Sequence, residues 1–274
     1  PTSLDAAAKA DVIVAALGES CEMSGESASR SDITIPDAQR DLLKKLVATG
    51  KPVVLLLFTG RPLALDWESE NVPAILNVWY AGSEAGHAVS DAVFGRTNPC
   101  GRLTTTFPRT VGQEPLYYNY LQCSRPPWTD DHFAAYSSSY IDVPNTPLYP
   151  FGFGLSYTTF EYGEPVLSSD IISDGKPVRI SVTVTNTGKR EGVETVQLYI
   201  HDSLASLARP VKELKNYQRV TLKPGETREV EFTLTVEDLK FYNADLKHVY
   251  EPGDFEIMVG PDSGHLNVKR IKGI

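Results

Sequence analysis

Residues 11–30 read DVIVAALGESCEMSGESASR, a short apolar run that ends in a loop rich in glycine, serine and glutamate. The run Val12–Leu17 has no polar interruption, which is typical of a parallel strand covered on both faces of its sheet. After it, Glu19, Glu22 and Glu26 stand within eight positions. Ligands of parallel α/β sheets bind beyond the carboxyl ends of the strands, so this loop lies where such a fold places its chemistry.

Two further apolar runs and two helical stripes extend this pattern. The runs are Pro52–Phe58 and Ala74–Val78, and the stripes lie in Asp37–Thr49 and Ser83–Phe94. Strands that alternate with helices predict an α/β layered sandwich with a mostly parallel sheet, which we assign to residues 1–109. Three strands make only part of such a sheet, and the first begins close to the start of the sequence. We therefore expect the chain to be the C-terminal part of something longer.

The composition changes after this segment. Residues 110–159 are rich in proline, tyrosine, serine and asparagine, and we interpret them as an ordered aromatic connector. Residues 160–274 predict an all-β sandwich of fibronectin III or immunoglobulin-like type, because Val178–Asn186 alternates with period two and short strands follow at regular turns. We expect those strands at Glu194–His201, Lys212–Leu222, Glu226–Thr235 and Asp254–Gly260. No helix is expected between Val178 and Gly260.

The bulk composition excludes some classes of function. With 274 residues and a formal net charge of −9, the chain is a poor partner for nucleic acid or for an anionic membrane surface. Its three cysteines are widely spaced, with neither a CxxC pair nor a histidine cluster nearby, which argues against a disulfide scaffold and a zinc site. No stretch approaches the roughly 18 apolar residues of a membrane span, and no signal peptide opens the sequence.

The glutamate-rich loop suits several kinds of site. A carboxylic acid that protonates a leaving group needs a loop free to place it and a partner carboxylate, and Glu26 beside Gly25 meets the first need. The same acids also suit a solvated loop that caps a helix or pairs with Arg30. A metal site made by Glu19, Glu22 and Glu26 lacks regular ligand spacing, and a phosphate loop lacks the GxxxxGK[ST] pattern. Spacing alone leaves the choice open.

Three side chains of the connector are candidates for contact with a sugar. Trp128 and Tyr136 offer aromatic faces on which a sugar ring can stack, and Arg125 offers donors for its hydroxyl groups. The alternative is an ordered linker in which these residues pack on the α/β sandwich.

Several segments together resemble one known family. They are MSGESASRSDITIP (23–36), GKPVVLLLFTGRPLAL (50–65), WYAGSEAGHAVSDAVFGRTNPCGRL (79–103), LYPFGFGLSYTTF (148–160) and LARPVKELK (207–215). With the segments between them, the chain resembles over nearly its whole length the C-terminal part of glycoside hydrolase family 3, in the bacterial periplasmic β-glucosidase branch. The resemblance implies the second half of an (α/β)6 sandwich followed by a fibronectin III-like domain.

The resemblance also implies roles for individual residues. Glu26 matches the acid/base glutamate of retaining β-glycosidases, Ser24 beside it is a candidate for substrate contact, and Glu19 is expected to be structural. The Asp nucleophile of such enzymes lies in an N-terminal barrel that is absent from these 274 residues. The chain alone is therefore expected to be nearly inactive.

The implied substrate is a terminal β-linked glucosyl residue of a β-glucoside or oligosaccharide, hydrolysed without a cofactor or a metal. The N-terminal barrel segment is the implied partner, a homodimer is a further arrangement, and the implied localisation is periplasmic or secreted. β-Xylosidase specificity stays open, as does a non-catalytic carbohydrate-binding or assembly fragment.

Overall fold

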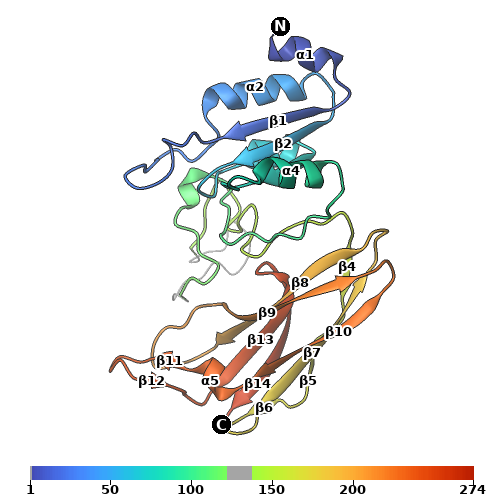
Figure 1. The fold of residues 1–274 in the computed structure, drawn as a ribbon. Coiled ribbons are helices and arrows are strands. Elements are labelled where there is room, and N and C mark those ends of the chain that lie inside the picture. Colours follow the sequence, from blue (N-terminus) through green and yellow to red (C-terminus); the bar gives the residue numbers. More distant parts are fainter. Residues whose placement is uncertain (1, 122–137) are drawn as a thin grey trace. The chain divides into compact units, whose positions relative to one another are not determined.

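The computed structural model describes residues 2–121 and 138–274, which form two compact units that are treated separately (Figure 1). The first unit consists of Pro1–Thr97, Phe107–Leu116 and Pro147–Tyr149. The second consists of Asn98–Thr106, Tyr117–Thr146 and Pro150–Ile274.

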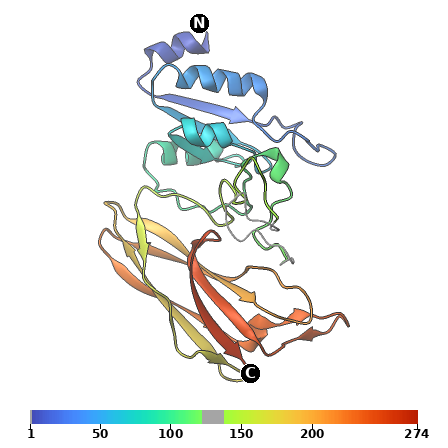
Figure 2. The same cartoon turned by 180° about the vertical axis from the view of Figure 1, so that it is seen from behind.

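The first unit is built around a three-stranded parallel sheet in the order β1-β2-β3 (Figure 2). Its strands are β1 (Ile13–Gly18), β2 (Val53–Phe58) and β3 (Ala74–Asn77). Leu55 of the central strand pairs with Ala15 on one side and with Ile75 on the other. The predicted α/β class and the parallel pairing are confirmed.

Four helices accompany this sheet: α1 (Ser3–Lys9), α2 (Asp37–Val47), α3 (Asp66–Asn71) and α4 (Ala85–Val93). The same unit contains the short 3-10 turn η1 (Val111–Gln113). The sequence pattern does not predict α3, because DWESEN has no apolar stripe. Its Glu68 is buried and lies 2.9 Å from Nε of Arg40 in α2, so an ion pair joins the two helices.

One face of the sheet is well covered and the other is open at its edge. Leu55 and Leu57 of β2 are fully buried, as is Leu43 of α2, which packs on β1. On the opposite face, Val12 and Val14 are 52% and 48% exposed. The prediction that the first strand is covered on both faces is therefore wrong within the described chain. Helix α4 likewise has no buried residue, although its sequence carries an apolar stripe.

The second unit is an all-β sandwich, as predicted. One sheet has the order β10-β7-β4, with β5 also paired to β7, and the other has the order β6-β14-β13-β8-β9. The strands of the two sheets are β4 (Phe160–Tyr162), β5 (Val166–Leu167), β6 (Ile171–Ile172), β7 (Val178–Asn186), β8 (Gly192–Asp202), β9 (Glu213–Leu222), β10 (Thr227–Leu234), β13 (Asp254–Asp262) and β14 (His265–Gly273). Aliphatic side chains from both sheets, among them Ile180, Leu198 and Ile257, form one buried core.

A single helical turn, α5 (Val236–Leu239), interrupts this pattern. The expectation of no helix between Val178 and Gly260 is therefore wrong at this one place. Thr235 and Asp238 form a capping box around the turn, and its first and last residues are buried. Local caps and core packing thus stabilise the turn, which leads from β10 to the small antiparallel pair β11 (Phe241–Tyr242) and β12 (His248–Val249).

A cluster of polar side chains is buried in the second unit. Nη2 of Arg102 lies 2.5 Å from Oε2 of Glu194, and the hydroxyl of Tyr162 donates to Oε1 of the same carboxylate at 2.7 Å. Burial raises the pKa of Glu194 above its ordinary value. Arg102 also donates to the carbonyl of Gly154 at 2.8 Å, so this cluster ties two loop segments to the sandwich.

Candidate functional site

The glutamate-rich loop begins at a strand end that is fixed on both sides. Gly18, the last residue of β1, donates its N–H to Oε1 of Gln39 at 2.7 Å and accepts from Nε2 of the same side chain at 2.9 Å. A Cβ at Gly18 would lie 1.8 Å from the carbonyl oxygen of Phe58, and its φ is +141°. The loop therefore starts from a backbone position that only glycine fits.

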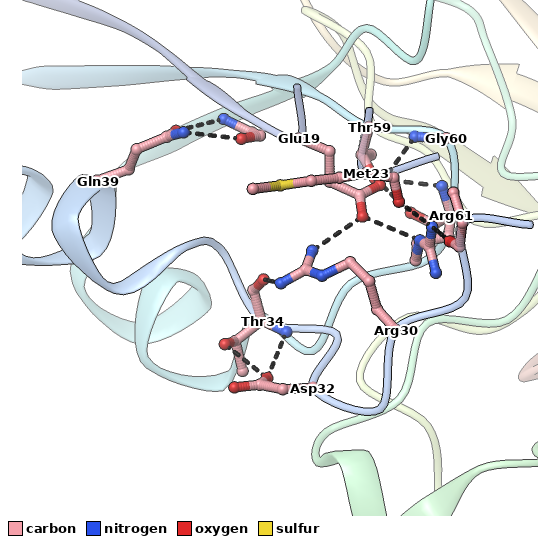
Figure 3. A network of polar contacts seen from close by, with 11 residues as sticks. Glu19, Met23, Arg30, Asp32, Thr34, Gln39, Thr59, Gly60 and Arg61 are labelled. Atoms are coloured by element: carbon pink, nitrogen blue, oxygen red, sulfur yellow. Dashed lines mark hydrogen bonds and ion pairs between the residues drawn. The ribbon is translucent and has the colours of Figure 1, made fainter. Parts of the chain in front are cut away.

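Glu19 lies at the centre of a buried ion-pair cluster (Figure 3). Its Oε1 is 2.8 Å from Nη1 of Arg30 and 2.9 Å from Nε of Arg61. Its Oε2 accepts hydrogen bonds from the Thr59 hydroxyl at 2.8 Å and from the Gly60 N–H at 3.2 Å. The Glu19 side chain is fully buried, so these partners take the place of water around its charge. This arrangement supports the structural role expected for Glu19.

The same partners decide the charge state of Glu19. Burial acts to raise the pKa of this carboxyl, but the hydrogen bonds from Arg30, Thr59 and Gly60 and the charge of Arg61 outweigh it. The pKa of Glu19 is therefore lowered. An ionised, fully occupied carboxylate is unsuited to giving up a proton or binding a metal. Within residues 2–121 and 138–274, no group of three or more His, Cys, Asp and Glu side chains could hold a metal ion.

Arg61 reaches from the end of β2 into the loop. Its Nη2 donates to the carbonyl oxygen of Met23, and the same nitrogen donates to the carbonyl oxygen of Ala28 at 2.9 Å. Because Nε faces Glu19, one guanidinium connects the buried carboxylate to two points of the loop backbone (Figure 3). The segment between those two points contains Ser24, Gly25 and Glu26.

Glu26 is exposed and occupies an unusual piece of backbone. Gly25 before it has a φ of +124°, and Ser27 after it has a φ of +62°. A serine in the left-handed region costs about 1 kcal/mol relative to an ordinary conformation. Arg30 pairs with Glu19 and not with Glu26, and it also donates to the Thr34 carbonyl at 3.0 Å. The loop thus presents the Glu26 carboxyl outward from a strained turn.

Ser24 lies against the end of β2. A Cβ at Gly60 would lie 1.9 Å from Oγ of Ser24 and 2.9 Å from a ring carbon of Tyr80, so both side chains sit directly beside this glycine. Contact between Ser24 and a substrate stays a prediction. The other predicted contact residues lie outside the described part of the chain: Arg125, Trp128 and Tyr136.

Sequence reasoning did not predict the side-chain contacts by which three residues shape this site. Gln39 fixes the start of the loop from α2, and Thr59 and Arg61 complete the cluster from the end of β2. The available signal was topological, since TGRP follows a parallel strand whose carboxyl end lies at the same sheet edge as the glutamate-rich loop.

Comparison with known proteins finds relatives along the whole chain. The family model described as "Glycosyl hydrolase family 3 C-terminal domain" matches residues 2–157. The family model described as "Fibronectin type III-like domain" matches residues 194–263. The periplasmic beta-glucosidase of Salmonella typhimurium is 50% identical over 264 residues, which are 96% of this chain and 34% of that protein. A beta-xylosidase of Formosa agariphila is 44% identical over 271 residues, which are 99% of this chain and 36% of that protein.

Solved structures give the same picture. The crystal structure of the beta-glucosidase from Listeria innocua in complex with glucose matches with a TM-score of 0.90 at 42% identity. That match covers 97% of this chain and 37% of the solved one. The chain therefore spans about a third of the length of the curated relatives named above.

Proposed function

The chain belongs to glycoside hydrolase family 3, and from this premise we propose that it carries the acid/base side of a retaining β-glucosidase active site. Glu26 is the general acid/base in this proposal. The observation that carries it is the position of Glu26, an exposed carboxyl in a strained turn beyond the carboxyl end of β1. That edge is where parallel α/β sheets bind their ligands.

The neighbouring acids are less suited to this role. Glu19 is ionised and surrounded by donors, so it has no proton to give at neutral pH. Glu22 is exposed like Glu26, but it lies outside the turn formed by Gly25 and Ser27. Within the described residues, no hydrogen bond or ion pair engages the Glu26 carboxylate. The same is true of Glu22, so the turn formed by Gly25 and Ser27 is what distinguishes Glu26 as the acid held out toward an incoming substrate.

The proposed reaction uses Glu26 twice. In the first step its carboxylic acid gives a proton to the glycosidic oxygen as that bond breaks, while a carboxylate on the other side attacks the anomeric carbon. In the second step the Glu26 carboxylate takes a proton from the water that displaces this nucleophile. The two carboxyl groups of a retaining enzyme lie about 5–5.5 Å apart. We propose that the nucleophile is an Asp from an N-terminal barrel segment outside these 274 residues.

The open side of the first sheet supports a further protein segment as partner. Val12 and Val14 leave apolar surface half exposed, and within the described residues β1 pairs with β2 alone. Burying such surface is favourable by about 25 cal/mol per Å².

The chain alone would hold the general acid but not the nucleophile, and a positioned general acid alone contributes roughly 10²–10⁴-fold to a rate. Without its partner segment the chain should therefore be nearly inactive.

The proposed substrate is a terminal β-linked glucosyl residue of a β-glucoside or oligosaccharide. A β-xyloside is the second candidate, because the relative from Formosa agariphila is named a beta-xylosidase.

Periplasmic or secreted localisation is proposed from the name of the Salmonella relative. None of the described helices is long and apolar enough to cross a membrane. A homodimer belongs to the same proposal and is tested by sedimentation.

The test is Glu26→Ala in the complete enzyme. Substrates with good leaving groups need little protonation, so their first step should survive while the glycosyl-enzyme intermediate accumulates. Azide attacks this intermediate without a general base and should restore turnover, with a β-glycosyl azide as product.

Glu22→Ala is the matched control, because it removes an exposed carboxyl from the same loop. It should behave like the unmodified enzyme. Azide rescue confined to Glu22→Ala would move the assignment to that residue. Unchanged turnover by both variants would place the acid/base outside this loop. It would leave open the alternative in which the chain is a non-catalytic carbohydrate-binding or assembly fragment.

A further inference from the structure

We propose that Arg61 is a positioning residue that sets where the Glu26 carboxyl lies, acting through the carbonyl groups of Met23 and Ala28. This inference rests on the proposed acid/base role of Glu26. Arg61 itself does not touch the carboxyl of Glu26; its contacts are with Glu19 and with the loop backbone.

The side chain of Arg61 joins two points of the loop backbone, one on each side of Glu26. Nη2 carries two hydrogens, and the two carbonyl oxygens that accept them belong to residues three before and two after Glu26. Nε lies 2.9 Å from Oε1 of the buried Glu19, which is fixed in turn by Arg30 and by the end of β2. Arg61 thus binds the backbone on both sides of Glu26 to the buried carboxylate at the end of β1, and its side chain is itself four-fifths buried.

The loop backbone between Met23 and Ala28 needs such support. Gly25 and Ser27, on either side of Glu26, both have positive φ values. An unfavourable backbone form persists only where the surroundings hold it in place. Hydrogen bonds from a charged donor to Met23 and Ala28 are stronger than those from a neutral one. Removing them would allow the turn to relax and move the carboxyl.

Arginine is the residue that this geometry requires. Its planar guanidinium spreads several N–H donors in fixed directions, whereas a lysine ammonium is a compact point charge. Arg61→Lys keeps a positive charge for Glu19, but it cannot span Glu19, Met23 and Ala28 together. A displacement of about 1 Å at a catalytic group can cost about 10²-fold in rate. The expected defect is therefore one of acid/base placement.

The experiment measures kcat/KM of Arg61→Lys in the complete enzyme across aryl and alkyl β-glucosides with leaving groups of graded pKa. This quantity reports the first chemical step, in which Glu26 gives up its proton. We expect a loss below about threefold for 2,4-dinitrophenyl β-glucoside and a loss of about 10²-fold for methyl β-glucoside. The inhibition constant of glucose should stay unchanged, because the sugar subsite is intact.

Two further variants keep the result interpretable. Arg40→Lys alters an arginine of the same unit that also pairs with a buried glutamate, Glu68, but that has no hydrogen bond to Met23 or Ala28. It should show no dependence on the leaving group. In Arg61→Ala, added ethylguanidine should restore activity toward methyl β-glucoside selectively.

Each outcome decides one of the two assignments. An equal loss on all substrates, or no loss in Arg61→Lys, overturns the positioning role of Arg61. So does a leaving-group dependence of the same size in Arg40→Lys. If Glu26→Ala itself shows no such dependence and no azide rescue, the proposed function fails, whatever Arg61 does.

Discussion

Nη1 of Arg30 lies 2.8 Å from Oε1 of Glu19, whose side chain is fully buried while about a fifth of the arginine remains exposed. Removing the negative charge leaves this arginine and Arg61 without their anion, and breaking a buried pair in this way costs about 3 kcal/mol or more. We expect Glu19→Gln to lower the free energy of unfolding of the first unit by about 3 kcal/mol.

Tryptophan fluorescence in a urea titration measures this change in a Trp128→Phe background. The two remaining tryptophans, Trp67 and Trp79, lie in the first unit. The control Glu22→Gln alters an exposed carboxyl and should stay within about 0.5 kcal/mol of the parent. Equal effects from both substitutions would show that the ion-pair cluster adds no stability.

The pH dependence of stability follows from the same carboxyl. The pKa of Glu19 in the folded protein lies below its ordinary value of 4.5, so the ionised form is the one that folding favours. Its contribution is fully present above pH 4.5 and is lost as the pH falls through the folded-state pKa. The stability gap between the parent and Glu19→Gln should therefore shrink as the pH is lowered from 7 to 3. A gap that widens over this range would contradict the assignment.

The end of β1 should tolerate only glycine. In Gly18→Ala the new Cβ would lie 1.8 Å from the carbonyl oxygen of Phe58, which is backbone and cannot move aside cheaply. We expect the first unit to unfold in this variant. Gly50→Ala is the control, because its φ of +72° is also unfavourable but its Cβ would meet no atom within 4 Å. It should cost only about 1 kcal/mol. Circular dichroism and urea unfolding distinguish the two outcomes.

Much of the fold could be predicted because apolar residues at buried positions recur in the sequence with a period that is typical of the element. The apolar run of β2 and the strict alternation of β7 are the signatures of a parallel strand and of a sandwich strand. Helix α3 leaves no such signature, since its six residues are stabilised by the ion pair between Glu68 and Arg40 and not by an apolar stripe. The exposed Val14 shows the converse limit, because an apolar run does not say what covers it.

The sequence predicts where the candidate site lies, but not which side chains contact one another there. The loop containing Glu26 follows an apolar strand, and the sheet class alone puts it at a ligand-binding edge. That Glu19 faces Arg61, which is 42 positions later, depends on the parallel register of β1 and β2. The hydrogen bond from Arg61 to the carbonyl oxygen of Ala28 is likewise a tertiary contact between a strand end and a loop. No local spacing rule contains this information.

The buried cluster of the second unit gives the last prediction. Glu194 is almost fully buried beside Arg102, and among the described residues only the hydroxyl of Tyr162 would remain as a hydrogen-bond partner once the guanidinium is removed. Arg102→Met should therefore destabilise the sandwich by about 3–5 kcal/mol, because a buried carboxylate is left without its cation. Tyr162→Phe removes one hydrogen bond to the same carboxylate and should cost less, about 1–3 kcal/mol.

The control for this pair is Arg228→Met, since Arg228 and Glu226 form an ion pair at 2.6 Å in which both side chains are substantially exposed. An exposed pair contributes about 0–1 kcal/mol, so this variant should unfold close to the parent. Hydrogen exchange of the β8 amides during denaturant titration reports the sandwich separately from the first unit. If Arg102→Met and Arg228→Met lower the protection of β8 equally, burial does not set the strength of the Arg102–Glu194 pair. If only Arg102→Met lowers it, and Arg102→Met combined with Glu194→Leu recovers most of the loss, then the cost comes from the unpaired charge and not from the lost contact.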